Sequence, residues 1–435
     1  MRVGSSSDMI SLDTRGAAAA ANTASVRRNG RELRTVEIGG LRVPYHLTVL
    51  TRPDPYLDIE AYDPEADLMA LNMGPQHPST HGVLRVKLYL DGETCIKAIP
   101  YLGYLHRGVE KLCEKLTYVQ ITPIVDKNDY VSPMMNELAI NMAFEALLGI
   151  EVPVRARYIR TICAEIQRVA SHLLWLGTFG LDVGGGIGGG ATLFMHTFRE
   201  RETCLDLFET LTGCRFHYNP HQVGGNRHDI PEGWDRRVDQ TLSRIAERVD
   251  EYEAFVENPI FRARTIGVGV IDPILAMELG AGGPILRGSG VDYDLRRDAP
   301  YAAYDQIEIQ VPVETSGDAY ARYLVRVREM RESIRIARTL LAGVPEGPIA
   351  ALKPVKGPTN VKPKAGKAYV SIESPRGELG TYVISDGTPN PYRCKLRPPS
   401  LHAAALLPYL APGSSVSDIV ATLGSLDFIL GEVDR

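Results

Sequence analysis

The chain has 435 residues, of which 44% are hydrophobic and 23% are charged, and these values are ordinary for a globular protein. A chain of this length can bury a large core in roughly one to three domains. The formal net charge of −5 at pH 7 gives no reason to expect nucleic acid as a partner. The most apolar stretch, Leu138 to Ile150, is interrupted by Asn141 and Glu145 and is too short to cross a bilayer, so we expect a soluble chain that can lie against a membrane protein.

Six cysteines are scattered along the chain without a Cys-X-X-Cys pair. In a chain this long, that spacing indicates reduced thiols rather than a disulfide scaffold. It also argues against an iron–sulfur cluster held by this chain alone, because such clusters usually need closely spaced cysteines. We expect all six to be buried or idle thiols. They are Cys95, Cys113, Cys163, Cys204, Cys214 and Cys394.

Residues 1–36 are rich in Ser, Ala, Arg and Asn and have no apolar segment of the kind found in secretory signals. A flexible N-terminal arm is therefore predicted. The alternative is a mitochondrial transit peptide, which the Arg, Ser and Ala content favours and which Asp8, Asp13 and Glu32 oppose.

An N-terminal β region is predicted for residues 37–102. Val83–Leu90 and Thr94–Ile99 are rich in β-formers and are joined at Asp91-Gly92, which favours a tight hairpin because glycine tolerates positive φ. The preceding stretch, Gly74–Gly82, contains two prolines and two glycines, which predict a non-regular backbone there.

A helical core is predicted for residues 103–345. Apolar residues recur there at intervals of three and four, as in Ile159, Ile162 and Ile166. Such stripes indicate core faces, and helices buried on several sides form a bundle. The predicted helices are Pro133–Leu148, Pro153 to about Gly180, Leu193–Leu211, one that follows Pro231 and includes Val238 to Tyr252, and Ala319–Leu341.

Residues 346–435 are predicted as a C-terminal α/β region. The strands Ala368–Ile372 and Gly380–Ile384 flank a turn at Ser374–Gly377, and a short helix follows at Val416–Leu423. The expected fold class is therefore α+β, with a mainly helical central bundle and small β elements contributed by both ends.

The glycine-rich stretch Gly184–Ala191 contains a GxGxxG/A pattern in Gly186, Gly188 and Ala191. A dinucleotide-binding fingerprint needs a strand before it, so that the turn directs a helix N-terminus at the pyrophosphate. Here a long predicted helix comes first, so we predict an interhelical loop rather than a nucleotide site.

Two histidines, His77 and His81, lie in the rigid stretch before the first hairpin. They could be zinc ligands, but no further ligands occur nearby in a recognisable spacing, so no metal site is predicted. A lone loop histidine is more often a structural hydrogen-bonding group. The charge-dense segments Leu105–Lys111 and Asp126–Tyr130 have a solvated face as their default interpretation. Asp182, at the end of the long apolar helix, is either exposed or orients a buried base.

Seven short motifs occur in order between about Met69 and Arg435. They are GPQHPSTHGVLR (Gly74–Arg85), LHRGVEK (Leu105–Lys111), Asp129-Tyr130, LRGSG (Leu286–Gly290), YDLR (Tyr293–Arg296), SDG with PYRCK (Ser385–Lys395) and GEVDR (Gly431–Arg435). Each is weak alone, but together they resemble the 49-kDa-type subunit, also called the D-type subunit, of NADH–quinone oxidoreductase (complex I). That family is related to the large subunit of nickel–iron hydrogenases, so the resemblance implies a hydrogenase-large-subunit-like fold. It also implies an enzyme complex that couples quinone reduction to proton translocation.

The resemblance implies a quinone site built by this chain, with quinone as the substrate. His81 and Tyr130 are expected to bracket the quinone headgroup, Asp182 to pair with His81, and His77 to line the same cavity. A histidine and a tyrosine can both donate protons to the basic oxygens of a reduced quinone. When His81 gives up its proton, Asp182 would lose its counter-charge, and this unpaired carboxylate is expected to help start the signal to the proton-pumping partners.

The resemblance also implies partners. Arg107 and His217 are expected near a terminal 4Fe–4S cluster whose ligands belong to the neighbouring B-type subunit, which fits the missing cysteine pairs. This chain alone is expected to bind no metal or cofactor. Further expected partners are the C-type subunit, other peripheral-arm subunits, and the H-type subunit of the membrane arm at the quinone entrance. The expected location is the cytoplasmic face of a bacterial inner membrane, with the matrix face of the mitochondrial inner membrane as the alternative.

Hydrogenase relatives carry two cysteine pairs that hold a metal centre. This chain has Asp129-Tyr130 and Gly431–Val433 in the corresponding regions, so the old metal cavity is expected to have become a quinone pocket. Three alternatives stay open: a structural subunit without quinone chemistry, a hydrogenase-type relative, and a photosynthetic-type complex driven by ferredoxin. The predicted headgroup contacts would suit ubiquinone and menaquinone alike.

Overall fold

The computed structural model describes residues 25–28, 31–38, 41–44, 68–184, 190–351 and 361–435. The chain divides into two compact units, residues 1–60 and 61–435. In the first unit, three antiparallel strands form one sheet in the order β1 (Ser25–Arg28), β2 (Arg31–Ile38) and β3 (Leu41–Pro44). Strands therefore begin before residue 37, while residues 1–24 of the predicted arm lie outside the described residues.

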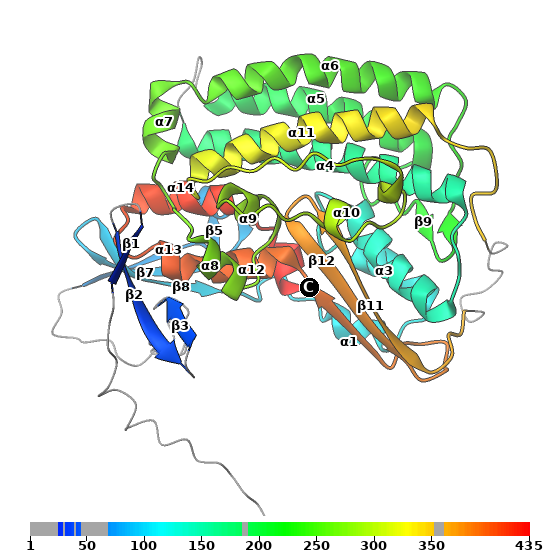
Figure 1. The fold of residues 1–435 in the computed structure, drawn as a ribbon, viewed down its shortest axis with the longest axis horizontal. Helices are drawn as coiled ribbons and strands as arrows, with labels where there is room; N and C mark the ends of the chain where they lie inside the picture. Colours follow the sequence, from blue (N-terminus) through cyan, green and yellow to red (C-terminus); the bar gives the residue numbers. More distant parts are fainter. Residues whose placement is uncertain (1–24, 29–30, 39–40, 45–67, 185–189, 352–360) are drawn as a thin grey trace, which may run out of the picture. The chain divides into compact units, whose positions relative to one another are not determined.

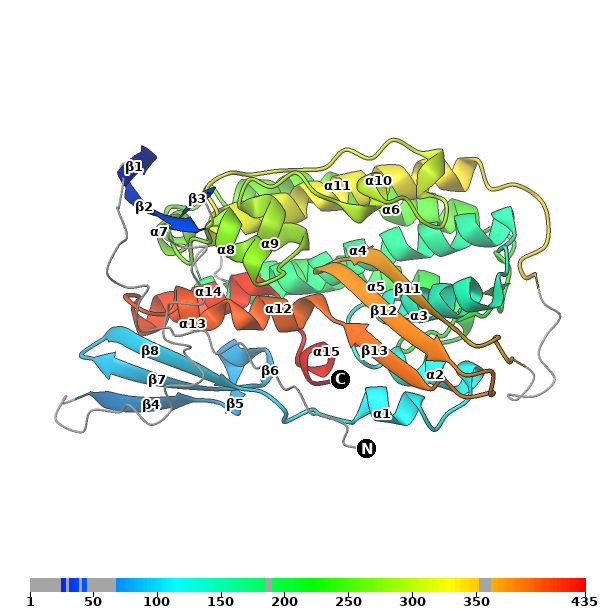
Figure 2. The same cartoon turned by 60° about the horizontal axis from the view of Figure 1, so that its bottom comes forward.

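The longest helices of the second unit lie together in one layer, at the top of Figures 1 and 2. Helix α4 (Val154–Val183) packs against α5 (Gly190–Thr212) and α11 (Ala319–Ala342), and α6 (Trp234–Phe255) packs on α5 and α11. Each matches a predicted helix, although α4 continues three residues beyond Gly180. No described helix is both long and apolar enough to cross a membrane.

Helix α3 (Pro133–Leu148) agrees with its predicted bounds at both ends because local signals punctuate it. Pro133 occupies the first helical turn, where a missing N–H costs nothing. Gly149 ends the helix with φ 64°, a conformation that glycine adopts without strain.

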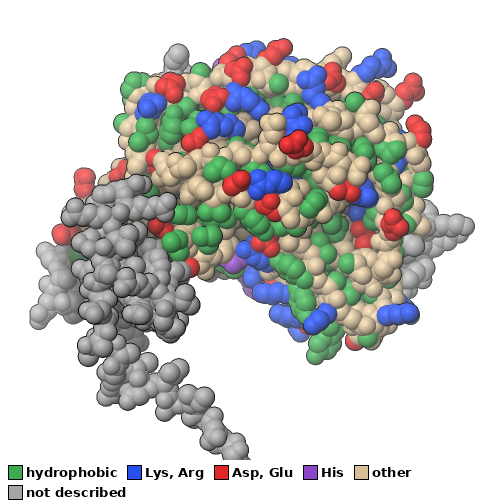
Figure 3. Space-filling model, in the orientation of Figure 1, with side chains coloured by type: hydrophobic (Ala, Val, Ile, Leu, Met, Phe, Trp, Pro, Cys, Tyr) green, Lys and Arg blue, Asp and Glu red, His purple; other side chains and the backbone are tan. Residues whose placement is uncertain are grey.

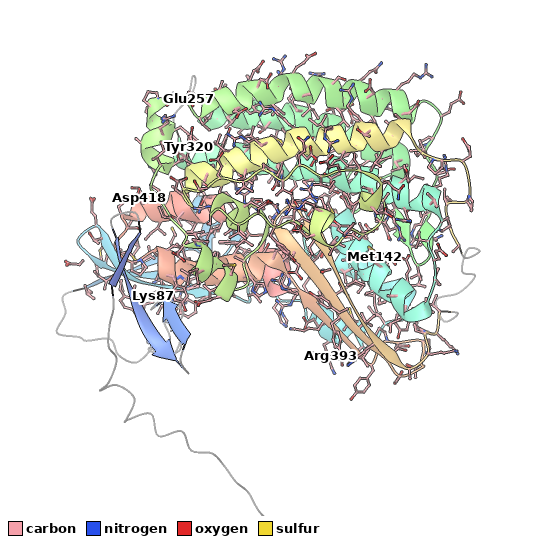
Figure 4. All side chains as sticks on the ribbon, in the orientation of Figure 1. Lys87, Met142, Glu257, Tyr320, Arg393 and Asp418 are labelled. Atoms are coloured by element: carbon pink, nitrogen blue, oxygen red, sulfur yellow. The ribbon has the colours of Figure 1, made fainter. Side chains whose placement is uncertain are left out.

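Small antiparallel sheets come from both ends of the second unit. In the N-terminal sheet the strand order is β4 (Met69–Met73), β7 (Arg85–Asp91) and β8 (Thr94–Tyr101), and the β7–β8 turn contains Gly92 at φ 58°. The predicted hairpin is thereby confirmed. Figure 4 shows Lys87 on β7, the middle strand of this sheet.

The C-terminal sheet has the order β11 (Gly366–Ser374), β12 (Gly377–Ser385) and β13 (Arg393–Arg397), and it packs against α3. Figure 4 shows Arg393 at the start of β13. The predicted turn at residues 374–377 is confirmed, but β13 was not predicted. The fold is thus mixed α+β, mostly helical with small antiparallel sheets.

Short elements connect these layers. Several begin with proline in the first turn, and α7 and α8 are also capped by Asn258 and Asp272. They are β5 (Gln76–His77), η4 (Pro78–Thr80), β6 (Gly82–Val83), α1 (Val109–Cys113), α2 (Tyr118–Val125), β9 (His221–Gln222), β10 (Gly225–Asn226), α7 (Pro259–Thr265), α8 (Pro273–Glu278), α9 (Gly283–Gly288), α10 (Leu295–Asp298), η5 (Tyr304–Gln306), α12 (Pro399–Ala405), α13 (Leu407–Leu410), α14 (Val416–Leu426) and α15 (Leu430–Asp434).

Charged side chains of both signs are interspersed over the face that α6 and α11 present in Figure 3. Ion pairs join these two helices, such as Arg331 with Asp250 at 2.7 Å and Arg338 with Asp239 at 2.8 Å. Exposed pairs of this kind contribute little, typically about 0–1 kcal/mol each.

A second set of charges is buried between helices α4, α9, α10 and α11 and strand β11. Arg287 lies 2.8 Å from Glu373 and 3.2 Å from Asp294, and it donates to Glu329. Arg296 pairs with Asp294 at 2.7 Å and with Glu165 at 3.2 Å. Every charge in this set has a partner of opposite sign, as burial of ions requires.

Asp434 is hydrogen-bonded to a loop that lies much earlier in the sequence. The Asp434 carboxylate accepts hydrogen bonds from the backbone N–H groups of Gly103 and Leu105, each at 2.7 Å. The imidazole of His106 lies 2.6 Å from the Asp434 carbonyl oxygen. These contacts fix the loop that leads to Arg107.

Candidate functional site

A cavity of about 490 Å³ opens between the His81 loop, the end of α4, the turn before α3 and the segment after α14. Its walls are largely apolar, with a few polar groups, as is typical of sites for small organic molecules. Its lining residues are Pro78, His81, Tyr130, Val131, Leu174, Thr178, Leu181, Asp182, Arg201, Phe216, Asp427, Phe428 and Ile429.

His81 and Asp182 form a hydrogen-bonded pair at this cavity, between Nε2 and Oδ2. His81 follows η4 and has φ 50°, so the chain turns sharply at this residue. Asp182 lies inside the last turn of α4 rather than after the helix, and its side chain is only 7% exposed. Burial raises the pKa of Asp182, while the hydrogen bond from His81 and the charges of His81 and His77 partly offset this. Asp182 is therefore not simply an exposed carboxylate, because it is largely buried and bonded to His81.

Tyr130 reaches the same cavity from the turn before α3. The carboxylate of Asp129 holds this turn by accepting from the backbone N–H groups of Val131 and Ser132, at 3.0 and 3.1 Å. Burial raises the pKa of the Tyr130 phenol, and the nearby Asp129 raises it further. The phenol therefore stays protonated near neutral pH and is available as a hydrogen-bond donor.

Arg376 links two segments that border the cavity, the turn before α3 and the segment after α14. Its guanidinium lies 2.8 Å from Asp129 Oδ2 and donates to the carbonyl oxygen of Asp427 at 2.9 Å. It also donates to Ser171 on α4 at 3.1 Å. Arg376 lies at the tip of the β11–β12 hairpin, a turn that the sequence predicts without indicating any role for the arginine.

Arg107 and His217 are both bonded to residues of the segment that leads into Tyr130. Arg107 donates to Asn128 Oδ1 at 2.7 Å, and His217 Nδ1 lies 2.6 Å from Asp126 Oδ1. Burial lowers the pKa of the Arg107 guanidinium, and the charge of Asp126 partly offsets this. Residues 126–130 therefore place Tyr130 at the cavity and also hold Arg107 and His217.

Two expectations need correction. The segment Asp126–Tyr130 is not a solvated face, because Asp126, Asn128 and Asp129 are buried and Lys127 is exposed. His77 is exposed and is not among the described residues that line the cavity, although its charge acts on Asp182.

Sequence reasoning missed Arg376, Asp427 and Gly424 as parts of this region. The signal for Gly424 was available, since a glycine inside a helical pattern often has a packing reason. Among the described residues, no group of three or more His, Cys, Asp or Glu side chains could hold a metal ion. Five cysteines are buried and Cys214 is exposed, all as free thiols.

Comparison with known proteins supplies the family. A model described as "Respiratory-chain NADH dehydrogenase, 49 Kd subunit" matches residues 188–435. The chain is 47% identical over 389 residues to the second D-type subunit of the NADH-quinone oxidoreductase of Koribacter versatilis, covering 84% of this chain and 96% of the relative. This chain belongs to the 49-kDa subunit family. The D-type subunit of Geotalea uraniireducens is 44% identical over 391 residues, with 85% and 99% covered, and that of Dehalococcoides mccartyi is 47% identical over 366 residues, with 84% and 98% covered.

As a 49-kDa-type subunit, the chain is part of the enzyme complex NADH–quinone oxidoreductase and works together with the other subunits of complex I. The segment matched by the family model contains Arg376 and the cavity wall from Asp427 to Ile429. His81, Tyr130 and Asp182 precede that segment, so the fold of the 49-kDa subunit joins its C-terminal half to three candidate site residues from its N-terminal half.

Proposed function

We propose that this subunit forms the quinone-reduction site of the complex together with the B-type subunit. The observation that carries the proposal is that His81 and Tyr130, which are far apart in sequence, line one cavity of about 490 Å³. The Asp182 carboxylate is hydrogen-bonded to His81 at its edge. The cavity is large enough for a quinone headgroup and supplies two donors of different chemical type.

In this proposal the two donors serve the two quinone oxygens. Reduction to quinol takes two electrons and two protons, and donors within hydrogen-bond reach stabilise the basic oxygens as they form. Tyr130 donates its phenol proton from one side and His81 donates Nδ1–H from the other, because its Nε2 is hydrogen-bonded to Asp182. Asp182 fixes the orientation of the imidazole and stabilises its protonated form.

The electron donor is proposed to be a 4Fe–4S cluster held by the B-type subunit. When present, that cluster supplies electrons to the quinone. Arg107 and His217 are proposed to face it, because Asn128 and Asp126 hold them next to the segment that carries Tyr130. A cation near a cluster stabilises its reduced form and raises its potential.

Coupling to proton translocation is proposed to start at Asp182. After His81 gives up its proton, this largely buried carboxylate has lost the cation to which it is hydrogen-bonded, which is costly in a poorly solvated site. The C-type subunit and the H-type subunit of the membrane arm are the further proposed partners, the latter at the quinone entrance. The proposed location is the cytoplasmic face of a bacterial inner membrane, and the fold is proposed to be hydrogenase-like.

The test uses membranes that carry the complex with Tyr130→Phe or His81→Ala. We expect both variants to assemble on a native gel, to reduce ferricyanide with NADH, and to lose most NADH:quinone activity with short-chain ubiquinone and menaquinone. Normal quinone activity in both variants would contradict the proposal and leave a structural subunit as the alternative.

A further inference from the structure

Helix α14 carries a glycine at a point where the helix faces the candidate site. Gly424 lies inside α14, two residues before its end at Leu426. Glycine inside a helix costs about 0.5–1 kcal/mol relative to alanine, so its presence needs a compensating reason. Gly424 has no positive φ, so the backbone conformation is not that reason.

The reason is the space that a side chain would occupy. A Cβ on residue 424 would lie 2.5 Å from Asp182 Oδ2 and 3.4 Å from Asp182 Cγ. It would also lie 3.1 Å from a ring carbon of Phe179. The first distance is far inside van der Waals contact, and Oδ2 is the same oxygen that accepts the hydrogen bond from His81.

Other contacts hold α14 and α4 together at this point. The indole Nε1 of Trp175 donates to the Gly424 carbonyl oxygen at 2.7 Å, which fixes α14 to α4 two turns before Asp182. Trp175 stacks on Phe179 with ring centres 4.8 Å apart, and Arg326 covers the Trp175 ring at 4.1 Å. The clash between a methyl group at residue 424 and Asp182 would therefore be relieved mainly by movement of the Asp182 side chain.

The element that leads into His81 also packs against α14. Helix α14 packs against η4, the short turn that leads directly into His81. Figure 4 shows Asp418 at the opposite, N-terminal end of α14, away from Gly424 in sequence. Helix α14 is thus in contact with both elements that carry the histidine–carboxylate pair.

We propose that Gly424 is a positioning residue of the quinone site, whose missing side chain lets Asp182 reach His81. This inference rests on the proposed function of that pair. Gly424 does not line the cavity and takes no part in proton transfer. It sets the place of the carboxylate oxygen that orients the imidazole.

The test is a single added methyl, Gly424→Ala, in membranes that contain the whole complex. If the methyl group met no obstacle, alanine would favour the helix and the activity would be unchanged. Our proposal instead predicts a kcat for short-chain ubiquinone that falls roughly 10- to 100-fold, the scale expected for a misplaced catalytic group. NADH:ferricyanide activity should stay normal, and Gly343→Ala is the matched control because its Cβ would have no neighbour closer than 3.9 Å.

The pH profile gives a second readout. The hydrogen bond from His81 holds the pKa of Asp182 down against the effect of burial, and His77 acts in the same direction. Moving the carboxylate away from His81 removes that influence, so the pKa of Asp182 rises further. The acid limb of quinone reduction should therefore shift to higher pH in Gly424→Ala and stay in place in Gly343→Ala.

A double variant separates a local clash from general damage. In the Asp182→Ala background the clashing oxygen is gone, so adding Gly424→Ala should cause less than about a twofold further loss, because the two changes act through one contact. A full additional loss would overturn the proposal. If Gly424→Ala fails to assemble but the double variant assembles, the clash with Asp182 is the cause and the proposal stands; failure of both overturns it.

The proposed function and the positioning role of Gly424 can be contradicted by different results. Wild-type quinone activity in Asp182→Ala and Tyr130→Phe would overturn the proposed function itself. Loss of activity in Asp182→Ala, together with a wild-type kcat and pH profile in Gly424→Ala, would overturn only the positioning role.

Discussion

Helix α4 carries members of two histidine–carboxylate pairs that have different surroundings. Asp182 pairs with His81 at the edge of the cavity, where the His81 side chain is 21% exposed. His172, ten residues earlier on the same helix, pairs with Glu329 on α11 at 2.9 Å, and both side chains are fully buried. The residue types are nearly the same, so the surroundings decide what each pair can do.

The difference lies in which groups compensate the buried carboxylate. Burial alone would raise the pKa of Glu329, but Arg287 and the hydrogen bond from His172 outweigh it and lower the pKa. At Asp182 burial prevails and the pKa is raised, because only His81 and His77 oppose it. Glu329 is thus fixed as an anion by permanent cations, whereas Asp182 depends on a histidine whose charge can change. Only the second arrangement can respond to proton transfer.

Breaking the inner pair should have the largest effect. Glu329→Gln leaves Arg287 without one of its anionic partners inside a fully buried network, which typically costs about 3–5 kcal/mol. We expect the complex to be absent from native gels or to dissociate at a clearly lower temperature. Glu346→Gln, at a fully exposed side chain, is the control and should assemble normally. A stable complex with Glu329→Gln would mean that the inner pair is as adaptable as the outer one.

Changing the outer pair should affect activity and spare stability. In Asp182→Asn the side chain keeps its shape and the negative charge is removed, so we expect quinone reduction to fall roughly 10- to 100-fold, as for loss of an orienting group. Because burial of this carboxylate is unfavourable, the dissociation temperature should stay the same or rise slightly. Steady-state NADH:quinone activity and native-gel melting measure the two effects. Wild-type quinone reduction and proton pumping in this variant would contradict the role given to Asp182.

A third buried acid, Glu432, makes the stability of the folded chain depend on pH. Burial, and next the charge of Asp129, raise the pKa of Glu432 to about 8. An acid whose pKa is raised in the folded state adds stability at low pH, and this contribution is lost as the pH rises from about 4.5 to about 8. Glu432→Gln should remove that loss, so the complex should dissociate less readily at pH 8 than the wild type does. An unchanged alkaline stability would show that Glu432 is already ionised at neutral pH.

The smallest expected effect is on the midpoint potential of the iron–sulfur cluster that is proposed to lie near Arg107. Arg107→Met removes a cation held by Asn128, so the midpoint potential of the terminal cluster should fall by on the order of 60 mV or less, the size of a tenfold change in a one-electron equilibrium. Redox titration followed by electron paramagnetic resonance measures it. An unchanged potential would remove Arg107 from the surroundings of the cluster.

Local signals explain which parts of the fold the sequence could predict. The bounds of α3 follow from Pro133 and Gly149, and the long helices follow from their apolar stripes. Elements such as α8 and α10 have six and four residues, too few for a helical period to show. Strand β13 does alternate buried Cys394 and Leu396 with more exposed neighbours, a signal that was present but short.

The candidate site could be predicted only in part, because its partners come from distant segments. His81 and Tyr130 were predicted from motifs and Asp182 from its place at the end of the long helix, and all three line one cavity. Burial of Asp129 could not be predicted, since Arg376, the residue that neutralises it, lies 247 positions later. Likewise, nothing near Gly424 in the sequence indicates that Asp182 will lie against it.

The contact between Asp434 and the loop at Gly103 has a consequence for biosynthesis. The bonded residues are 331 positions apart, so the loop that leads to Arg107 leaves the ribosome long before its acceptor is made. At about 5–20 residues per second, that interval is on the order of half a minute. During translation the Gly103 and Leu105 amides must find temporary partners, in water or in a chaperone. The segment that later faces the proposed electron donor is thus among the last parts of the nascent protein to reach its final form.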